Sequence, residues 1–397
     1  MSTTKSFRLL CAATLFHFLA MGVFLSALPL FVTNGLHGSK AVVGLAIGAF
    51  SITSVVSRPW VGRRVDRLGR RWFLRGAPAL ISLTAVALTA AMTITAVVVL
   101  RMVQGLAGSS YYTAAATTTT DLSPDHRRAD YISRFSLFLY GGFAAGPALG
   151  EVLIERFSYN AAWLTAAGFA LVAALIASRI PETVPAAISA DSTRSRRVFH
   201  PAALGPGLVL LTVAVGYTSI QAFTPLYARS IGMSSSGYLY ATFALTILAV
   251  RLASGRMADR FGRVQIALPG LVLGVAGMGL LAAVPRPAAA FIGIAMFAAC
   301  HALIFPALMA LTVDRVTDAE RGEVLGSFTA CFDAGAAPGG LLVGYIADHG
   351  GFGYAWATPA LFCVAGIVVL LLVARTEGEL PRRSRASETP PMEPAGT

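Results

Sequence analysis

The chain has 397 residues, of which 56% are hydrophobic and only 13% charged, and its formal net charge is +12. Soluble domains carry about 25% charged residues, so this composition excludes an ordinary soluble protein and indicates a chain that faces lipid. In a soluble protein the positive charge would suggest a nucleic-acid partner. Here the basic residues gather between apolar runs, which excludes that class as well.

Twelve apolar runs follow one another along the chain, each long enough to cross a bilayer as a helix of about 20 residues. The first six runs are residues 7–32, 42–61, 72–92, 94–120, 131–153 and 161–180, and the second six are 204–228, 237–257, 264–284, 288–313, 324–346 and 354–374. Lys5 and Arg8 lie at the start of the first run, which is too long for a signal peptide and therefore predicts an uncleaved first helix. Cys11, Cys300, Cys331 and Cys363 lie scattered in apolar runs, without the spacing of a metal or redox site.

The lysines and arginines lie mainly in alternate connections between the runs. If the N-terminus is cytoplasmic, about 26 of the 31 basic residues fall on the cytoplasmic side, as the positive-inside rule requires. We therefore expect a multi-pass protein of the cytoplasmic (inner) membrane with both termini in the cytoplasm.

The chain is an internal duplication. The stretch GRRVDRLGRR (62–71) after the second run is matched about 193 residues later by GRMADRFGR (255–263) after the eighth run. Arg58 and Arg251 precede the two copies, and Asp121 and Asp314 end the fourth and tenth runs, at the same spacing. We expect a six-helix bundle over 1–180, a cytoplasmic linker over 181–203, a second six-helix bundle over 204–375 and a disordered cytoplasmic tail over 376–397.

These repeated turns resemble the loop motif of the major facilitator superfamily of secondary transporters, Gly-x-x-x-Asp-Arg/Lys-x-Gly-Arg/Lys-Arg/Lys. The first copy fills every fixed position, and in the second copy only Val264 departs. The matching positions are Gly62, Asp66, Arg67, Gly69, Arg70 and Arg71, then Gly255, Asp259, Arg260, Gly262 and Arg263. The resemblance implies an all-α polytopic fold of twelve transmembrane helices in two six-helix bundles, which rock about a central site.

The resemblance also implies that these turns gate the transporter. Gly62 and Gly69 would permit a tight reversal of the chain, and Asp66 would meet an arginine or the positive end of a helix. Arg70 could reach Asp121, and such a charge pair would form in one conformation and break in the other. We extend this role to the second copy and Asp314. The alternative is that the arginines only anchor the loops to anionic lipid.

The fourth run contains LRMVQGLAGSS, which places Arg101, Gln104, Gly105 and Gly108 on one helical face. A charged residue inside a membrane span marks a functional site by default. The pattern Arg-x-x-Gln-Gly resembles the fourth-helix motif that the family's antiporters use in proton transfer. Because an arginine does not release its proton at ordinary pH, we expect Arg101 to tune an acid or orient substrate. The alternative is an arginine that extends to the membrane surface.

The fifth run contains YGGFAAGPALGEVL, in which Gly142, Gly146 and Gly150 form a smooth stripe for close helix contact and Pro147 loosens the backbone. This stretch resembles the fifth-helix signature of drug–proton antiporters. Ser133 and Glu151 stand where that signature has glycine.

Two acids are candidates for proton coupling. Asp333 lies about 18 Å along its helix from Arg321, near the middle of the membrane, and the sequence shows no basic partner for it nearby. Glu151 comes second, because its position about 30 Å beyond Tyr131 would place it in the outer headgroup layer. Related antiporters have an acid in the first or fourth helix, and here the interiors of those runs contain none.

The central cavity of this fold is lined by spans 1, 4, 7 and 10. Polar and aromatic candidates for substrate contact there are His17, Phe24, Gln104, Tyr111, Tyr112, Tyr217, Gln221 and His301. Many aromatic and few charged residues favour a mostly apolar ligand, although aromatic residues at helical spacing also serve as packing.

The sequence therefore predicts a monomeric secondary transporter, without enzymatic activity, metal or cofactor, whose partners are a small-molecule substrate, protons and membrane lipid. We expect proton-coupled efflux of lipophilic or amphiphilic compounds. The first alternative is a sugar or metabolite permease, coupled or uncoupled. The remote alternative is a non-transporting receptor or a membrane enzyme, which lacks support because no catalytic constellation or extramembrane domain stands out.

Overall fold

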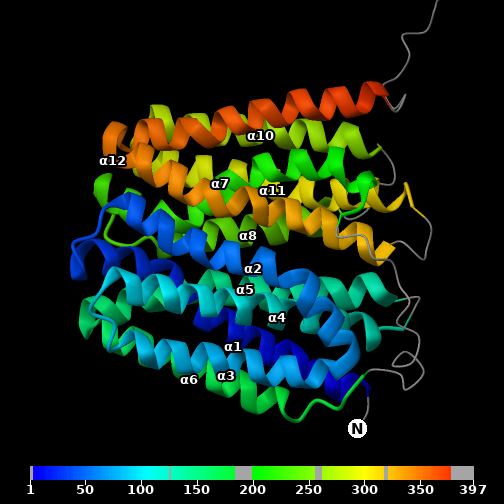
Figure 1. Ribbon diagram of the computed structural model, residues 1–397. Coiled ribbons are helices and arrows are strands. Elements are labelled where there is room, and N and C mark those ends of the chain that lie inside the picture. The colour runs from blue at the N-terminus through cyan, green and yellow to red at the C-terminus, as the bar shows by residue number, and fades with distance from the viewer. Residues whose placement is uncertain (1–2, 125–126, 184–198, 255–261, 317–320, 377–397) are drawn as a thin grey trace, which may run out of the picture.

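The computed structural model describes residues 3–124, 127–183, 199–254, 262–316 and 321–376, and every regular element in these ranges is helical (Figure 1). Most of the predicted linker, the predicted tail from residue 377 onward and much of the second turn motif lie outside these ranges.

The helices follow the predicted apolar runs closely. The first half has α1 (Thr3–Leu30), continued by a π-helical turn (Phe31–Gly35), α2 (Lys40–Leu68), α3 (Arg70–Leu88), α4 (Ile94–Asp121), α5 (Arg128–Arg156) and α6 (Tyr159–Ala177). The second half has a 3-10 turn (Pro201–Ala203), α7 (Leu204–Ser230), α8 (Gly237–Ser254), α10 (Arg263–Ala283), α11 (Pro287–Val313) and α12 (Arg321–Thr376).

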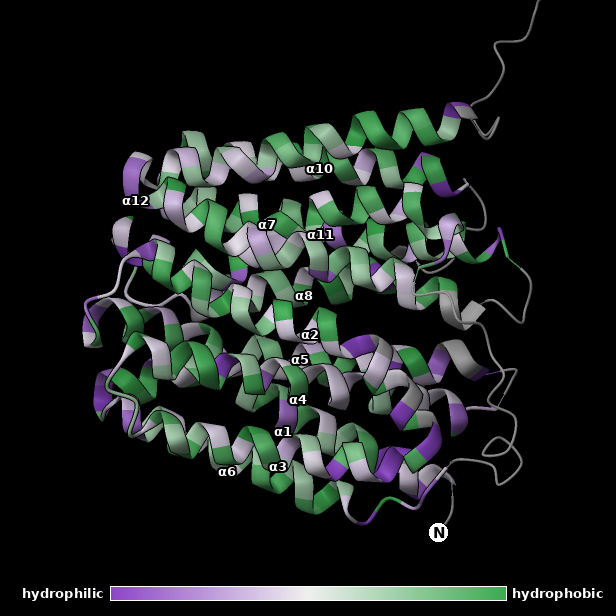
Figure 2. Ribbon diagram, in the orientation of Figure 1, coloured by the Kyte–Doolittle hydropathy of each residue, from purple (hydrophilic) through white to green (hydrophobic). Residues whose placement is uncertain are grey.

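Helix α12 is two helices in one. Gly351 breaks it with φ 77° and ψ −176°, and with this division the described residues contain twelve helices. Within the described ranges, nine helical segments are long and apolar enough to cross a membrane, and one of these is the doubled α12. The arginine-bearing α3 and the shorter α8 complete the set of twelve. The predicted twelve-helix, all-α architecture is confirmed. Figure 2 shows hydrophobic residues along the lengths of the helices and hydrophilic residues concentrated at their ends.

The long axes of the twelve helices are aligned, so the helices end at two opposite faces of the molecule (Figure 1). We call the end that carries the N-terminus and the turns at Gly69 and Gly262 the turn face, and the other end the opposite face. In the first half, the helices that start at the opposite face have short hydroxyl caps: Ser39, Thr93 and Ser158 accept hydrogen bonds from the backbone N–H groups of Val42, Ala96 and Ala161. Such caps satisfy N–H groups that the helix itself leaves unpaired.

Within each half, glycines allow helices to pack backbone against backbone. A Cβ on Gly146 of α5 would lie 2.7 Å from the Cα of Gly22 in α1, and one on Gly142 would lie 2.7 Å from the backbone of Phe18. The second half repeats this contact, because Gly335 and Gly339 of α12 meet the backbone of α7. The fifth-run glycine stripe thus lies against α1.

Between the halves, α2 packs against α12, α5 against α8, and α1 against α7. The α2–α12 contact is closest toward the opposite face, where a Cβ on Gly44 would overlap the carbonyl oxygen of Gly340. A Cβ on Gly48 would lie 2.6 Å from the carbonyl oxygen of Ala337. The two halves therefore meet without intervening side chains on this side of the molecule.

Candidate functional site

At the turn face, each half contains one arginine–aspartate pair between neighbouring helices. Arg70 Nε at the start of α3 lies 3.1 Å from Asp121 Oδ2 at the end of α4. Arg263 Nη2 at the start of α10 lies 2.8 Å from Asp314 Oδ2 after α11. Both pairs occupy equivalent positions of the duplicated unit, and both link helices within one half.

The chain reverses at a glycine in each copy. Gly69 has φ 94° and Gly262 has φ 86°, values that L side chains rarely adopt. Gly62, which we expected to share the reversal, lies inside α2, because that helix continues to Leu68. Arg67 is exposed, while Gly255, Asp259, Arg260 and the side chain of Asp66 lie outside the described part of the structure.

Glu182, which the sequence did not single out, completes the first turn. Its carboxylate accepts hydrogen bonds from the backbone N–H groups of Arg70, at 2.9 Å, and Arg71, at 3.1 Å, and so caps α3. A Cβ on Gly69 would collide with Glu182 Oε2. The signal that could have identified Glu182 is a carboxylate immediately after the sixth run, on the side where α3 begins.

Asp333 has a basic partner, contrary to our expectation. It forms an ion pair with Arg58 of α2, and this pair joins the two halves. The side chain of Asp333 is 8% exposed and that of Arg58 is 23% exposed. The sequence could not show this pair because its two members are 275 positions apart and meet only when α2 packs against α12.

The duplicated position of Arg58 is Arg251, and it also reaches across to the other half. Its guanidinium carbon lies 5.1 Å from the centroid of the Tyr140 ring on α5. Tyr140 is the counterpart of Asp333 at the repeat spacing. The duplicated arginines thus both contact the equivalent position of the other half. The partner of Arg58 is a carboxylate, and the partner of Arg251 is an aromatic ring.

Arg101 points into the protein. It is 5% exposed, its Nη1 donates to Gln104 Oε1 at 2.8 Å, and its guanidinium lies 4.6 Å from the centroid of Phe50 on α2. A Cβ on Gly105 would overlap the carbonyl oxygen of Phe50, and one on Gly108 would touch the Phe50 ring. The fourth-run motif therefore packs α4 tightly against α2, and the alternative of an arginine that extends to the surface does not fit.

Glu151 is buried, five residues before the end of α5. It is 3% exposed, and it accepts hydrogen bonds from the backbone N–H groups of Ser236 and Gly237 at the start of α8. The hydroxyl groups of Ser235 and Ser236 donate to it as well. Because α8 belongs to the other half, Glu151 joins the halves near the opposite face.

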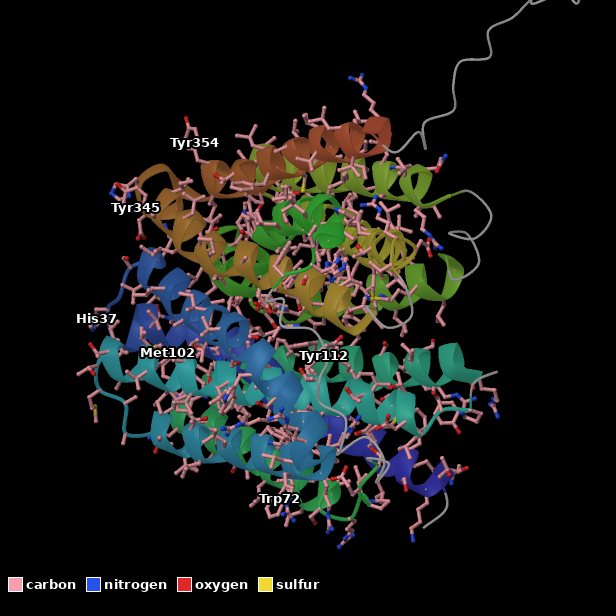
Figure 3. The ribbon with its side chains drawn as sticks, turned by 45° about the vertical axis from the view of Figure 1, so that its right-hand side comes forward. His37, Trp72, Met102, Tyr112, Tyr345 and Tyr354 are labelled. Atoms are coloured by element: carbon pink, nitrogen blue, oxygen red, sulfur yellow. The ribbon has the colours of Figure 1, made fainter. Side chains whose placement is uncertain are left out.

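The candidate substrate residues of the first half fall into two environments. His17 stacks on Tyr111 with ring centroids 3.9 Å apart, and the Tyr111 hydroxyl bonds to Thr14. Phe24 is 2% exposed and stacks on Trp163 of α6, so it contacts its own half. By contrast, Tyr112 is 38% exposed and lies near mid-length of the bundle (Figure 3).

In the second half, Tyr217 and His301 belong to one aromatic cluster. Their ring centroids are 4.9 Å apart, and Phe332 and Phe243 lie 5.3 Å and 5.9 Å from Tyr217. His301 Nδ1 is buried and has no hydrogen-bond partner among the described residues.

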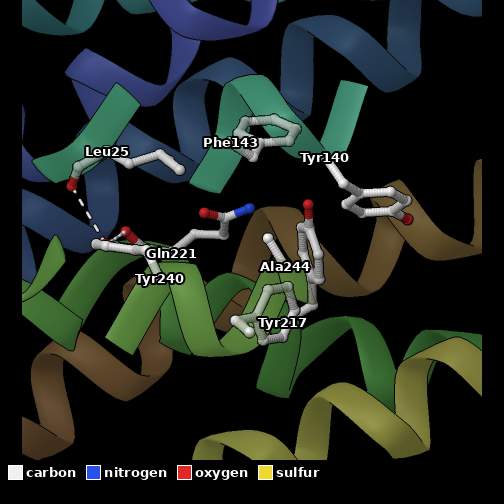
Figure 4. A pocket seen from close by; sticks show the side chains of 8 residues that line it. Leu25, Tyr140, Phe143, Tyr217, Gln221, Tyr240 and Ala244 are labelled. Carbon is white, nitrogen blue, oxygen red and sulfur yellow. Dashed lines mark hydrogen bonds between the residues drawn. The ribbon is translucent and has the colours of Figure 1, made fainter. Parts of the chain in front are cut away.

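A small cavity lies between the halves (Figure 4). It is lined from the first half by Leu25, Tyr140 and Phe143 and from the second half by Tyr217, Gln221, Tyr240, Phe243 and Ala244. The Tyr240 hydroxyl closes one side by donating to the carbonyl oxygens of Leu25, at 3.3 Å, and Gln221, at 3.0 Å. The cavity has a volume of about 10 Å³, which holds about one water molecule.

The cavity includes two of the predicted substrate residues, Tyr217 and Gln221. Apart from Leu25 of α1, the other lining residues come from α5 and α8, two helices that the sequence did not assign to the cavity. Aromatic residues are common in any apolar helix, so the sequence does not show which of them line a cavity. The packing of α5 against α8 identifies those of these two helices.

Comparison with known proteins agrees with this architecture. The family model of the Major Facilitator Superfamily matches residues 10–250 and 233–395. An uncharacterised MFS-type transporter of Salmonella typhimurium is 26% identical over 386 residues, which cover 94% of this chain and 98% of the relative. An uncharacterised MFS-type transporter of Burkholderia pseudomallei is 29% identical over 399 residues, which cover 97% and 95%.

Solved structures show the same fold. A mutant form of the nucleoside transporter NupG superposes with a TM-score of 0.76 at 13% identity, covering 93% of this chain and 99% of that one. The human organic anion transporter MFSD10 superposes with a TM-score of 0.72 at 18% identity, covering 93% and 100%. The chain is a membrane transporter that belongs to the Major Facilitator Superfamily.

Proposed function

We propose that this transporter exports lipophilic or amphiphilic small molecules in exchange for protons, with the turn face in the cytoplasm. The observation that carries the proposal is the Arg58–Asp333 ion pair. It is an acid–base pair buried inside the bundle, and its two members lie on different halves. A family member moves its substrate by rocking such halves against each other.

The pair couples proton binding to this movement through its charge. A proton on the Asp333 carboxylate removes its negative charge and with it most of the attraction for Arg58. The α2–α12 contact then loses its ion pair and keeps only its packing and the hydrogen bonds of Asp348 at the start of α2, so the halves separate more easily. Loss of the proton restores the pair and the contact.

The aromatic lining of the inter-half cavity supports an apolar or amphiphilic substrate. Five of its eight lining residues are aromatic, and Gln221 is the one side chain with an amide. A sugar would need several hydrogen-bonding groups, because its hydroxyls lose water on binding. The nucleoside and organic-anion transporters compared above share only the fold with this chain, so their substrates give no assignment here.

The test uses everted membrane vesicles with an acidic interior and a dye that reports the pH gradient. We expect a compound from a panel of lipophilic cations, anions and neutral aromatics to dissipate the gradient with the native protein, and Asp333→Asn to abolish this response. Asp130→Asn is the matched control, because Asp130 is a partly exposed acid at the start of α5 that pairs with Arg127 and Arg134 of its own segment of the chain.

Two results would contradict the proposal. Compounds that accumulate equally with the native protein and Asp333→Asn, without any change in the gradient, would rule out Asp333 as the coupling group. A response to sugars or polar metabolites alone would replace efflux by the permease alternative.

A further inference from the structure

We infer that Arg251 is the binding site for the negative charge of an amphiphilic organic monoanion, whose apolar body lies against the aromatic residues between α5, α7 and α8. This inference rests on the proposed transport of amphiphilic compounds and narrows their class. Its starting point is the difference between the two duplicated arginines.

Arg251 lies in the last described turn of α8, within the membrane span. It is 14 residues, or about 21 Å, along α8 from Gly237, which lies at the opposite face. The hydrocarbon core of a bilayer is about 30 Å thick, so Arg251 lies within it. Charged side chains at such depth face protein or a water-filled cavity and mark functional positions by default. The side chain is only partly buried and lies over the ring of Tyr140 from the other half, so it faces the space between the halves.

Arg251 lacks the counter-charge that its duplicate has. Arg58 pairs with Asp333, whereas the residue at the equivalent position for Arg251 is Tyr140. Across the ranges that the structure describes, no carboxylate forms an ion pair with Arg251, and its buried Nε has no hydrogen-bond partner. The face of an aromatic ring attracts a cation. The N–H groups of the guanidinium point outward in the guanidinium plane, however, so the ring does not accept hydrogen bonds from them. The guanidinium therefore retains donors for an anion.

The surroundings of Arg251 fit an aromatic or aliphatic body. Ala244, which lines the inter-half cavity, lies seven residues before Arg251 and so on the same side of α8, about 10 Å away. Tyr140 lines that cavity and also contacts Arg251, so the ring of Tyr140 lies between the arginine and the cavity.

The chemistry of the ligand follows from these groups. One guanidinium matches one carboxylate or similar monoanion, and its planar donors favour two parallel hydrogen bonds to it. The cavity is too small for a ligand in this conformation, so binding requires α5 and α8 to move apart on the side of Arg251.

The test measures binding directly, by calorimetry on the full chain in lipid nanodiscs. Three probes share one body and differ in charge: naphthylacetate, naphthylacetamide and naphthylethylamine. We expect naphthylacetate to bind about tenfold more tightly than the amide, or better, and the amine to bind most weakly. Arg251→Gln should remove the preference for the anion while the amide binds as before, and Arg251→Lys should keep part of it.

Tyr140→Asp tests the role of the missing counter-charge most directly, because it places a carboxylate at the position equivalent to Asp333. It should neutralise Arg251 and abolish the preference for naphthylacetate. Arg229→Gln removes the same charge from an exposed position at the end of α7 and should change nothing. A midpoint of thermal unfolding equal to that of the native protein shows that each variant is folded.

The outcomes separate this inference from the proposed function. A native protein that binds naphthylacetate no more tightly than the amide, or an Arg251→Gln variant that keeps the preference, overturns the inference even if proton-coupled efflux is demonstrated. An anion preference that depends on Arg251 and persists in Asp333→Asn supports the inference even if no probe dissipates a pH gradient.

Discussion

Glu151 of α5 caps the first turn of α8, because its two carboxylate oxygens accept hydrogen bonds from the backbone N–H group of Ser236 at 3.0 Å and 2.8 Å. The second half returns this contact. Asp348 of α12 accepts hydrogen bonds from the backbone N–H groups of Lys40, at 2.9 Å, and Ala41, at 2.8 Å, at the start of α2. Each half thus supplies a carboxylate that caps a helix of the other half at the opposite face.

Glu151→Gln should favour opening of the opposite face. The amide keeps one acceptor oxygen but places N–H donors against the N–H groups of α8, and loss of a helix cap costs about 1 kcal/mol. We expect about a fivefold rise in the ratio of open to closed molecules. The measurement is the distribution of distances between spin labels on Met92→Cys and Tyr354→Cys, two exposed sites at this face, with the four buried cysteines replaced.

Glu155→Gln is the control for this experiment, since Glu155 is one turn further along α5 and exposed. It should leave the distances unchanged. Equal distributions for Glu151→Gln and the native protein would show that the cap does not hold the halves together.

The Arg58–Asp333 pair should show strong coupling in a double-mutant cycle. Asp333→Asn leaves the Arg58 charge unpaired inside the bundle. Because the Arg58 side chain is 23% exposed, we expect a loss of about 1–3 kcal/mol, below the cost of breaking a fully buried pair. Arg58→Gln combined with Asp333→Asn removes both charges and should recover most of this loss. Thermal unfolding, followed by the fluorescence of the buried Trp163 and Trp356, measures the difference.

The exposed pair of Arg134 and Asp130 on α5 provides the comparison. Removing either member should leave the thermal unfolding nearly unchanged, because solvent screens the charges. A double variant of the buried pair as unstable as the sum of its single variants would contradict the coupling.

Gly69→Ala should destabilise the protein, whereas Gly62→Ala should not. A side chain at Gly69 has an unfavourable φ of 94° and would collide with Glu182, so we expect a loss of about 1–3 kcal/mol and weaker capping of α3. Gly62 lies within α2 with open space around its Cα, so alanine should be neutral or slightly stabilising there. The measurement is the midpoint of thermal unfolding in detergent. Equal midpoints for the two variants would show that the reversal tolerates a side chain.

The sequence by itself determined the membrane environment, the twelve helices and the duplication. These follow from the length of the apolar runs and the arrangement of charges, which depend on local properties of the chain. It also pointed to the Arg70–Asp121 contact, because the turn that carries Arg70 and the end of α4 that carries Asp121 must share one face of the membrane.

Only the tertiary structure decided which residues of one half meet those of the other. Arg58 finds Asp333, Arg251 finds Tyr140, and Glu151 finds Ser236 across an interface between helices far apart in the chain. Nothing in local sequence specifies such partners, since a charge inside an apolar run can face lipid, its own bundle or the other half. The rotation of each helix about its axis decides among these, and packing of backbone against backbone at glycines such as Gly44 and Gly340 sets that rotation.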